Sequence, residues 1–301
     1  MEWLISANRE MYDHVKAFME LPYVDWEQKY NYSIGDLVYI YSAIPVQAID
    51  FLVEVIATDI SSAHFQDDKL YWHDMKKYKE GKARGKFVRF KLIKYFGVDA
   101  IPLEELCKHG LKGRIQGARK LLNDDNSTKE LGLFIKSRVD DISRRDENEK
   151  QDLKLHREIA SERFDKNEKY VYSDKVKDKT KPIETKGIKI YKRDKETAIR
   201  ALGIAGFRCE IDCNHYTFIR KNTNIYYTEP HHLIPMAYQD DFDKSIDIEE
   251  NIVSLCSNCH NEIHYGRDAK KLIEKLYNQR KEFLAKKKLN ISLEKLFSYY
   301  N

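Results

Sequence analysis

Residues 227–235 read YTEPHHLIP, residues 250–256 read ENIVSLC and residues 259–264 read CHNEIH. These stretches decide how the C-terminal third folds and what chemistry it can carry. His260 and His264 are four residues apart, so on a helix both imidazoles lie on one face, where they can reach one metal ion or one phosphate. His231 and His232 lie in an expected strand, where adjacent side chains point to opposite faces. One of them can therefore bind a metal while the other faces a substrate.

Two cysteine pairs frame these stretches. Cys256 and Cys259 form a CxxC pair, and Cys209 and Cys213 form a CxxxC pair. Tetrahedral zinc is held by four such ligands on two short loops, so the spacing predicts a structural four-cysteine Zn²⁺ site. The remaining histidines lack such spacing and are predicted to be structural: His14, His64, His73, His109, His156 and His215.

The histidine and cysteine stretches together resemble an HNH endonuclease of the zinc-knuckled kind. The resemblance implies a ββα-metal fold, in which two strands and a helix surround one divalent ion such as Mg²⁺ or Mn²⁺. It implies that His231 and His260 bind this ion and that His264 is a third ligand or a phosphate contact. It also implies that His232 is the general base that activates water, and that Asn251 braces the loop and orients His232. The catalytic set is thus His231, His232, Asn251 and His260.

The first 125 residues are expected to form a β-rich domain with many aromatic side chains. The pattern predicts a helix over Glu10–Leu21 and strands over Trp3–Ser6, Asp36–Tyr41, Ile49–Asp59 and Lys86–Phe96. Some of the aromatic residues must be core, and others can stack on a base, because a nucleobase pocket needs π faces.

Four stretches of this region resemble an EVE domain of the PUA-like superfamily. They read EWLISAN at residues 2–8, VDWEQ at 24–28 and IGDLVYIYSAIP at 34–45, with a closing segment at 111–119. An EVE domain joined to an HNH domain resembles a modification-dependent, type IV restriction endonuclease of bacteria. The implied substrate is double-stranded DNA that carries 5-methylcytosine or 5-hydroxymethylcytosine, with the modified base flipped into the EVE pocket. The candidate pocket residues are two aromatic walls, Trp26 and Tyr41, and three polar readers, Ser6, Asn8 and Ser42.

The resulting fold class is α+β, in three parts. The resemblances imply that residues 1–125 form a PUA-like (EVE) β-barrel with flanking helices, residues 126–190 a charged helical connector, and residues 191–301 an HNH domain with the ββα-metal fold. Within the connector, Asp146–Asp165 has helical composition and a thin apolar stripe, which makes it a candidate contact of a homodimer. Asp174–Gly187 is too polar and lysine-rich to pack, and is expected to be a mobile linker.

Charge and targeting signals narrow the class of partner. The net charge is only +4, but residues 69–94 hold ten basic and two acidic side chains, and residues 267–288 hold nine and three. Beside a nuclease motif, such clusters favour contact with phosphates over a merely solvated face. The chain lacks a signal peptide and a long apolar run, which predicts a cytoplasmic protein that contacts no membrane.

Two alternative functions remain open at this stage. In one, both metal sites are structural, and the protein is a non-catalytic, zinc-containing reader of modified DNA or RNA. In the other, the HNH nuclease acts on RNA.

Overall fold

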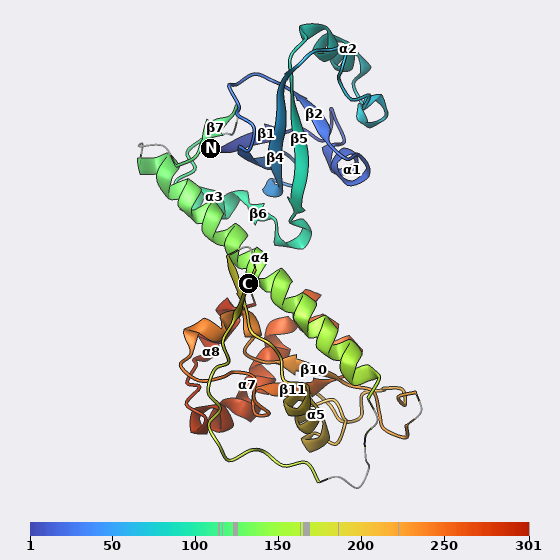
Figure 1. Ribbon diagram of the computed structural model, residues 1–301, viewed down its shortest axis with the longest axis vertical. Coiled ribbons are helices and arrows are strands. Elements are labelled where there is room, and N and C mark those ends of the chain that lie inside the picture. The colour runs from blue at the N-terminus through green and yellow to red at the C-terminus, as the bar shows by residue number, and fades with distance from the viewer. Residues whose placement is uncertain are drawn as a thin grey trace. The chain divides into compact units, whose positions relative to one another are not determined.

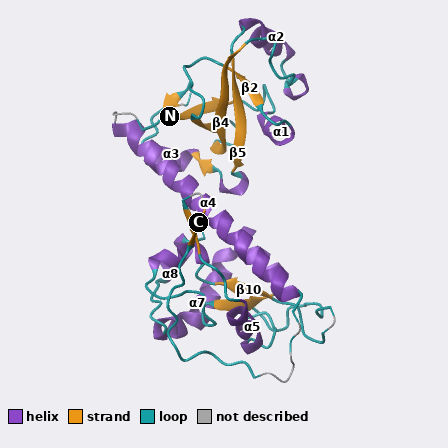
Figure 2. Ribbon diagram, in the orientation of Figure 1, coloured by secondary structure: helices purple, strands orange, loops and turns teal. Residues whose placement is uncertain are grey.

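The computed structural model describes the 301-residue chain apart from residues 114, 116, 123–125, 163, 165–168, 186, 222 and 301. Arg114 and Gln116 of the closing segment predicted at 111–119 lie outside the described residues. The chain forms two compact units, Met1–Ile142 and Ser143–Asn301. Strands and helices occur in both units, which confirms the α+β class (Figures 1 and 2). The predicted domain boundaries at 125/126 and 190/191 stay predictions.

The N-terminal unit is built on one seven-stranded sheet. Its strands follow the order β2-β5-β4-β3-β1-β7, and β6 pairs with β4. β1 and β3 are parallel, and the other neighbours are antiparallel. The bounds are β1 Glu2–Ala7, β2 Val24–Glu27, β3 Leu37–Ser42, β4 Ala48–Ile60, β5 Phe87–Tyr95, β6 Ile101–Pro102 and β7 Arg119–Lys120. The four predicted strands are confirmed as β1, β3, β4 and β5.

Side chains alternate along each strand, so each strand contributes to both faces of the sheet. Each face is covered by a separate buried cluster. On one face, Trp3 and Ile5 pack with Val38 and Ile40, and α1 (His14–Glu20) covers them. On the other, Leu4 and Tyr39 pack with α3 (Leu103–Lys108) and with the first part of α4 (Asn126–Ala160). The other helices of this unit are η1 Lys69–Tyr71, α2 Met75–Arg84 and η2 Gly97–Asp99.

Helix α4 contributes to the cores of both units. Leu131, Ile135 and Ile142 are buried in the N-terminal unit, whereas Leu155 and Ile159 are buried in the C-terminal unit against α5. The helix predicted over Asp146–Asp165 is confirmed up to Ala160 as the second part of a 35-residue helix, and residues 163 and 165 lie outside the described residues. The apolar residues proposed as a dimer contact are largely engaged within the chain itself, and the homodimer stays a prediction.

The C-terminal unit places a two-stranded sheet directly before a helix. β10 (Glu229–His232) pairs antiparallel with β11 (Ile252–Leu255), with His231 opposite Val253 and His232 opposite Ile252. Cys256 then begins α6 (Ser257–Tyr265). The unit's other elements are β8 Ile183–Thr185, β9 Ile188–Ile190, α5 Lys195–Ile204, η3 Met236–Asp241, α7 Ala269–Lys286 and α8 Leu293–Ser298.

The segment predicted as a mobile linker makes defined contacts in the C-terminal unit. β8 pairs with β9, and the backbone carbonyl of Lys177 accepts a hydrogen bond from the Ser245 amide at 2.9 Å. The Lys177 ammonium also pairs with Asp194 at 3.0 Å. These contacts compensate for the low apolar content on which the prediction depended. Within the described ranges, no helix combines the length and apolar character that crossing a bilayer requires.

Candidate functional site

Three cysteines and one histidine converge at the start of α6. The ligand atoms of Cys209, His215, Cys256 and Cys259 all lie within 4.8 Å of one another. The Nδ1 atom of His215 is 3.3 Å from Sγ of Cys259 and 3.6 Å from Sγ of Cys256. Three thiols and an imidazole are a frequent ligand set for structural zinc, so these residues would hold Zn²⁺.

This cluster corrects the prediction of a four-cysteine site. Cys213 is exposed and does not belong to the group, and His215, predicted to be structural, takes the fourth position. The local turn gives the reason. The Asp212 side chain accepts the Asn214 amide at 2.8 Å, and its carbonyl accepts the His215 amide at 3.0 Å. With this tight turn, the side chain of His215 lies in the cluster and that of Cys213 lies at the surface.

A second cluster joins β10 to α6 through three histidines. The ligand atoms of His231, His260 and His264 lie within 4.8 Å of one another, and their ring centroids are 5.0–5.1 Å apart. His260 and His264 occupy successive turns of one helix face, as their spacing predicts. Burial first, and then the neighbouring His264 and His260, lower the pKa of His231 well below its ordinary value. It is therefore neutral at pH 7, the form that binds a metal.

Hydrogen bonds fix the orientation of two of these rings. Nδ1 of His260 donates to Glu229 at 2.6 Å, which leaves its Nε2 for a metal. Burial alone would raise the pKa of Glu229, but the bonds from His260 and Ser257 outweigh it and lower the pKa to about 2. Tyr300 donates to the Leu233 carbonyl at 2.7 Å and lies 2.9 Å from Nε2 of His231. His231 therefore donates through Nε2 and presents Nδ1.

Asn251 and His232 are both buried, but they belong to different hydrogen-bond groups. Asn251 accepts the Ile234 amide at 2.8 Å and donates to the carbonyls of Ile234 and Ile246 at 3.0 and 2.8 Å. It thus closes the loop between β10 and β11, as the resemblance implies. The side chain that contacts His232 is Asp247, whose Oδ1 is 2.9 Å from Nε2 of the ring. The expectation that Asn251 orients His232 directly is corrected in favour of Asp247.

The two strand histidines open into one cavity of about 390 Å³. Helix α4 forms part of its wall with Asp152 and His156. His156 bonds the Pro230 carbonyl at 2.8 Å, and its ring centroid is 5.1 Å from that of His260. No sequence pattern predicts this role, because His156 lies 74 residues before Pro230 and has no motif spacing to it.

A second cavity, of about 480 Å³, lies in the N-terminal unit. Three of the five predicted pocket residues line it: Ser6, Asn8 and Trp26. The rest of its lining is largely aromatic and acidic, and includes Tyr12, Asp25, Phe65, Asp68, Trp72 and Tyr78. The Tyr12 ring centroid is 5.8 Å from that of Trp26 and 5.0 Å from that of Trp72. Burial raises the pKa of Asp68 to about 6, against the opposing effect of the Tyr12 and Trp72 donors.

Tyr41 and Ser42 do not line this cavity, contrary to the prediction. Tyr41 is buried in the core on the other face of the sheet, with Leu4 and Ile49. Ser42 is fully buried and donates to Asp50 at 2.7–2.8 Å, while its oxygen lies 2.6 Å from Nε2 of His14. The Ser42 hydroxyl is therefore engaged in a core hydrogen-bond network rather than free to meet a ligand.

Comparison with known proteins gives one relative with a defined activity. No family model matches the sequence. The chain is 37% identical over 98 residues to the type IV methyl-directed restriction enzyme EcoKMcrA of Escherichia coli (strain K12). The match covers 32% of this chain and 33% of that enzyme, so it spans about a third of the relative's length.

Two solved structures share a lower similarity. An ASCH protein from Zymomonas mobilis has a TM-score of 0.33 and 14% identity, covering 43% of this chain and 92% of its own. A protein from Pseudomonas putida has a TM-score of 0.32 and 18% identity, covering 46% of this chain and 99% of its own.

Proposed function

We propose that this protein is a modification-dependent DNA endonuclease of the HNH type. The observation that carries the proposal is the convergence of His231, His260 and His264 in one cavity beside the buried His232. A cluster of three imidazoles with a fourth beside it is what metal-assisted hydrolysis needs. The 98-residue similarity to a methyl-directed restriction enzyme supports DNA as the substrate.

In this proposal the histidines have separate roles in phosphodiester hydrolysis. His231, His260 and His264 would hold a divalent cation, which supplies charge stabilisation at the phosphate when bound. His232 removes a proton from the attacking water through the ring nitrogen that is not bonded to Asp247. Asn251 keeps the loop closed behind this base. The nearby Cys209/His215/Cys256/Cys259 cluster would hold a structural zinc that fixes the start of α6.

The N-terminal cavity is proposed to read the modified base. A flipped cytosine is planar, so it can stack between aromatic side chains such as Trp26, Tyr12 and Trp72. Asp68 offers a buried carboxylate oxygen to an exocyclic amine, and Ser6 and Asn8 offer polar groups at the cavity wall. The 5-methyl- or 5-hydroxymethylcytosine substrate rests on the sequence resemblance to EVE domains and on the name of the relative.

Metal removal tests the nuclease assignment. We expect protein dialysed against EDTA to keep one tightly bound zinc and to lose all cleavage of modified plasmid DNA. Mg²⁺ or Mn²⁺ should restore cleavage, because the histidine cluster holds its ion with neutral ligands and exchanges it more readily than the thiolate cluster. His260→Ala should keep the zinc and stay inactive after metal is added.

The alternative functions give different results in the same assay. Two zinc ions that resist EDTA, with no cleavage after metal is restored, would show a non-catalytic reader. RNA of the same sequence serves as a parallel substrate. Faster cleavage of RNA than of modified DNA would show that the substrate of the nuclease is RNA.

A further inference from the structure

Asp247 connects the buried His232 to a second hydrogen-bond group on the far side of the loop between β10 and β11. Its side chain is almost fully buried, with 4% of the residue exposed. Oδ1 lies 2.9 Å from Nε2 of His232, and Oδ2 accepts the backbone amide of Asp194 at 2.8 Å. The two carboxylate oxygens therefore have different partners, and the group cannot rotate without losing both.

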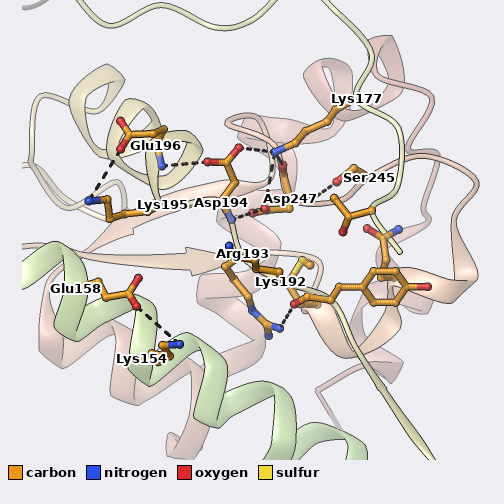
Figure 3. Close-up of a pocket in the computed structure, with 14 residues that line it drawn as sticks. Lys154, Glu158, Lys177, Lys192, Arg193, Asp194, Lys195, Glu196, Ser245 and Asp247 are labelled. Carbon is orange, nitrogen blue, oxygen red and sulfur yellow. Dashed lines mark hydrogen bonds and ion pairs between the residues drawn. The ribbon is translucent and has the colours of Figure 1, made fainter. Parts of the chain in front are cut away.

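Oδ2 of Asp247 faces two hydrogen-bond donors, the backbone amide of Asp194 and the ammonium of Lys177. Figure 3 shows Lys177, Asp194 and Asp247 meeting at the wall of a cavity of about 650 Å³. The Lys177 ammonium is 3.8 Å from Oδ2 of Asp247 and donates to the Asp247 carbonyl at 3.0 Å. It is held in place by Asp194 at 3.0 Å and Thr197 at 3.2 Å. Ser245 accepts the Asp247 amide at 3.2 Å.

This arrangement decides which nitrogen of His232 carries the proton. The carboxylate oxygens of Asp247 are acceptors, and Oδ2 already accepts the Asp194 amide, so Nε2 of His232 carries the hydrogen that lies between it and Oδ1. Nδ1 is then the atom with the free lone pair. It faces Asp152, whose Oδ1 is 3.8 Å away, beyond hydrogen-bond distance, and is itself bonded to Arg193 at 2.7 Å. Asp152 and His232 both line the cavity of the histidine cluster.

We infer that Asp247 is a positioning residue that holds His232 in the tautomer with Nδ1 free to accept a proton. The inference rests on the proposed function only for the consequence on cleavage. The tautomer itself follows from the contacts of Asp247, whatever reaction the site performs. In the other tautomer, His232 has no lone pair that faces the cavity and cannot accept a proton from water there. The orientation of the Asp247 carboxylate therefore affects the rate of cleavage.

The substitution Asp247→Asn separates this role from a structural one. An asparagine keeps the size of the side chain, but only one of its two terminal atoms can accept a hydrogen bond. The Asp194 amide and the Lys177 ammonium are both donors, so the amide oxygen takes the Oδ2 position. The amide NH₂ group then points at His232 and donates to Nε2. His232 must carry its proton on Nδ1, and its free lone pair is lost from the cavity.

The experiment combines ¹⁵N NMR of the histidine rings with single-turnover cleavage, both on zinc-loaded full-length protein. His232 signals are assigned by comparison with His232→Gln. We expect the Nε2–H form in the unaltered protein and the Nδ1–H form in Asp247→Asn. The cleavage rate should fall by roughly 10³–10⁴-fold, with unchanged thermal stability and unchanged affinity for DNA. Asp178→Asn is the matched control, because it removes an exposed carboxylate that pairs with Lys244. It should keep tautomer and rate.

Two results would overturn the inference. One is an Nδ1–H His232 in the unaltered protein, which decides the matter even when Asp247→Asn does not fold. The other is an Asp247→Asn protein that cleaves within tenfold of the unaltered rate. If the unaltered protein cleaves nothing, the proposed function fails, while the ring tautomers still decide whether Asp247 positions His232.

Discussion

Replacing His232 with alanine is expected to lower the rate of DNA cleavage by roughly 10²–10⁴-fold, the usual contribution of a general base. DNA affinity and zinc content should not change, because His232 belongs to neither the cysteine cluster nor the three-histidine cluster. The measurement is single-turnover cleavage of a modified duplex, with affinity measured in parallel in Ca²⁺.

The alanine variant needs a second substitution beside it. His232 is buried and bonded to Asp247, so its removal leaves a carboxylate without its partner and lowers the free energy of unfolding by about 1–3 kcal/mol. His232→Gln keeps a donor for Asp247 and still provides no base, and should be equally inactive. His73→Ala, at an exposed histidine, is the control that should stay active. A His232→Gln protein with more than a tenth of the original rate would remove His232 from the mechanism.

Replacing His215 with alanine is expected to release the structural zinc and unfold much of the C-terminal unit. The cluster joins the loop at Cys209–His215 to the start of α6, so its loss separates α6 from the segments before β10. Structural zinc contributes roughly 10–16 kcal/mol of apparent binding free energy in small zinc-dependent domains at pH 7, and loss of one ligand removes a large part of it. The measurements are zinc content by mass spectrometry and thermal unfolding followed by circular dichroism.

Cys213→Ser is the matched control for the zinc prediction. Cys213 comes from the same turn, but its side chain is exposed and outside the cluster. It should bind one zinc and unfold at the temperature of the unaltered protein. The reverse pattern, with zinc lost from Cys213→Ser and kept by His215→Ala, would restore the four-cysteine arrangement.

The parts of the site that could be predicted from the sequence are local. His260 and His264 share a helix face because of their spacing, and Cys256 and Cys259 share one turn at its start. His231 joins them because β11 pairs with β10 and leads directly into α6. Spacing alone predicted the shared helix face and the CxxC pair, whereas the place of His231 beside them was implied by the family resemblance.

The parts that were missed depend on long-range packing. Asp247 reaches His232 only because Asn251 closes the loop between the strands, and Asp152 and His156 come from a helix far back in the sequence. No spacing rule connects these residues to the histidine and cysteine stretches. His215, and not Cys213, belongs to the cysteine cluster because of the turn at Asp212. The spacing of the cysteines alone does not distinguish between these two residues.

The N-terminal pocket shows an error that depends on packing. Tyr41 and Ser42 are adjacent in β3 and both are engaged in the core, where Tyr41 packs with Leu4 and Ile49 and Ser42 donates to Asp50. Trp72 lies against Tyr12 in the cavity, but no local pattern distinguishes it from the other aromatic residues of this region. Its position depends on the packing of the segment after β4, which the local sequence does not reveal.

Under the proposed function, the protein cuts DNA only where it reads a modified cytosine. The direct measurement is the initial cleavage rate on three duplexes of identical sequence, with cytosine, 5-methylcytosine or 5-hydroxymethylcytosine, in Mg²⁺ or Mn²⁺. We expect at least one modified duplex to be cut roughly ten to a hundred times faster than the plain one, because one extra methyl-sized group buried in an apolar pocket contributes about 1–3 kcal/mol. Trp26→Leu should cut all three at the same low rate. Equal rates on all three duplexes with the unaltered protein would show that cleavage does not depend on the modified base.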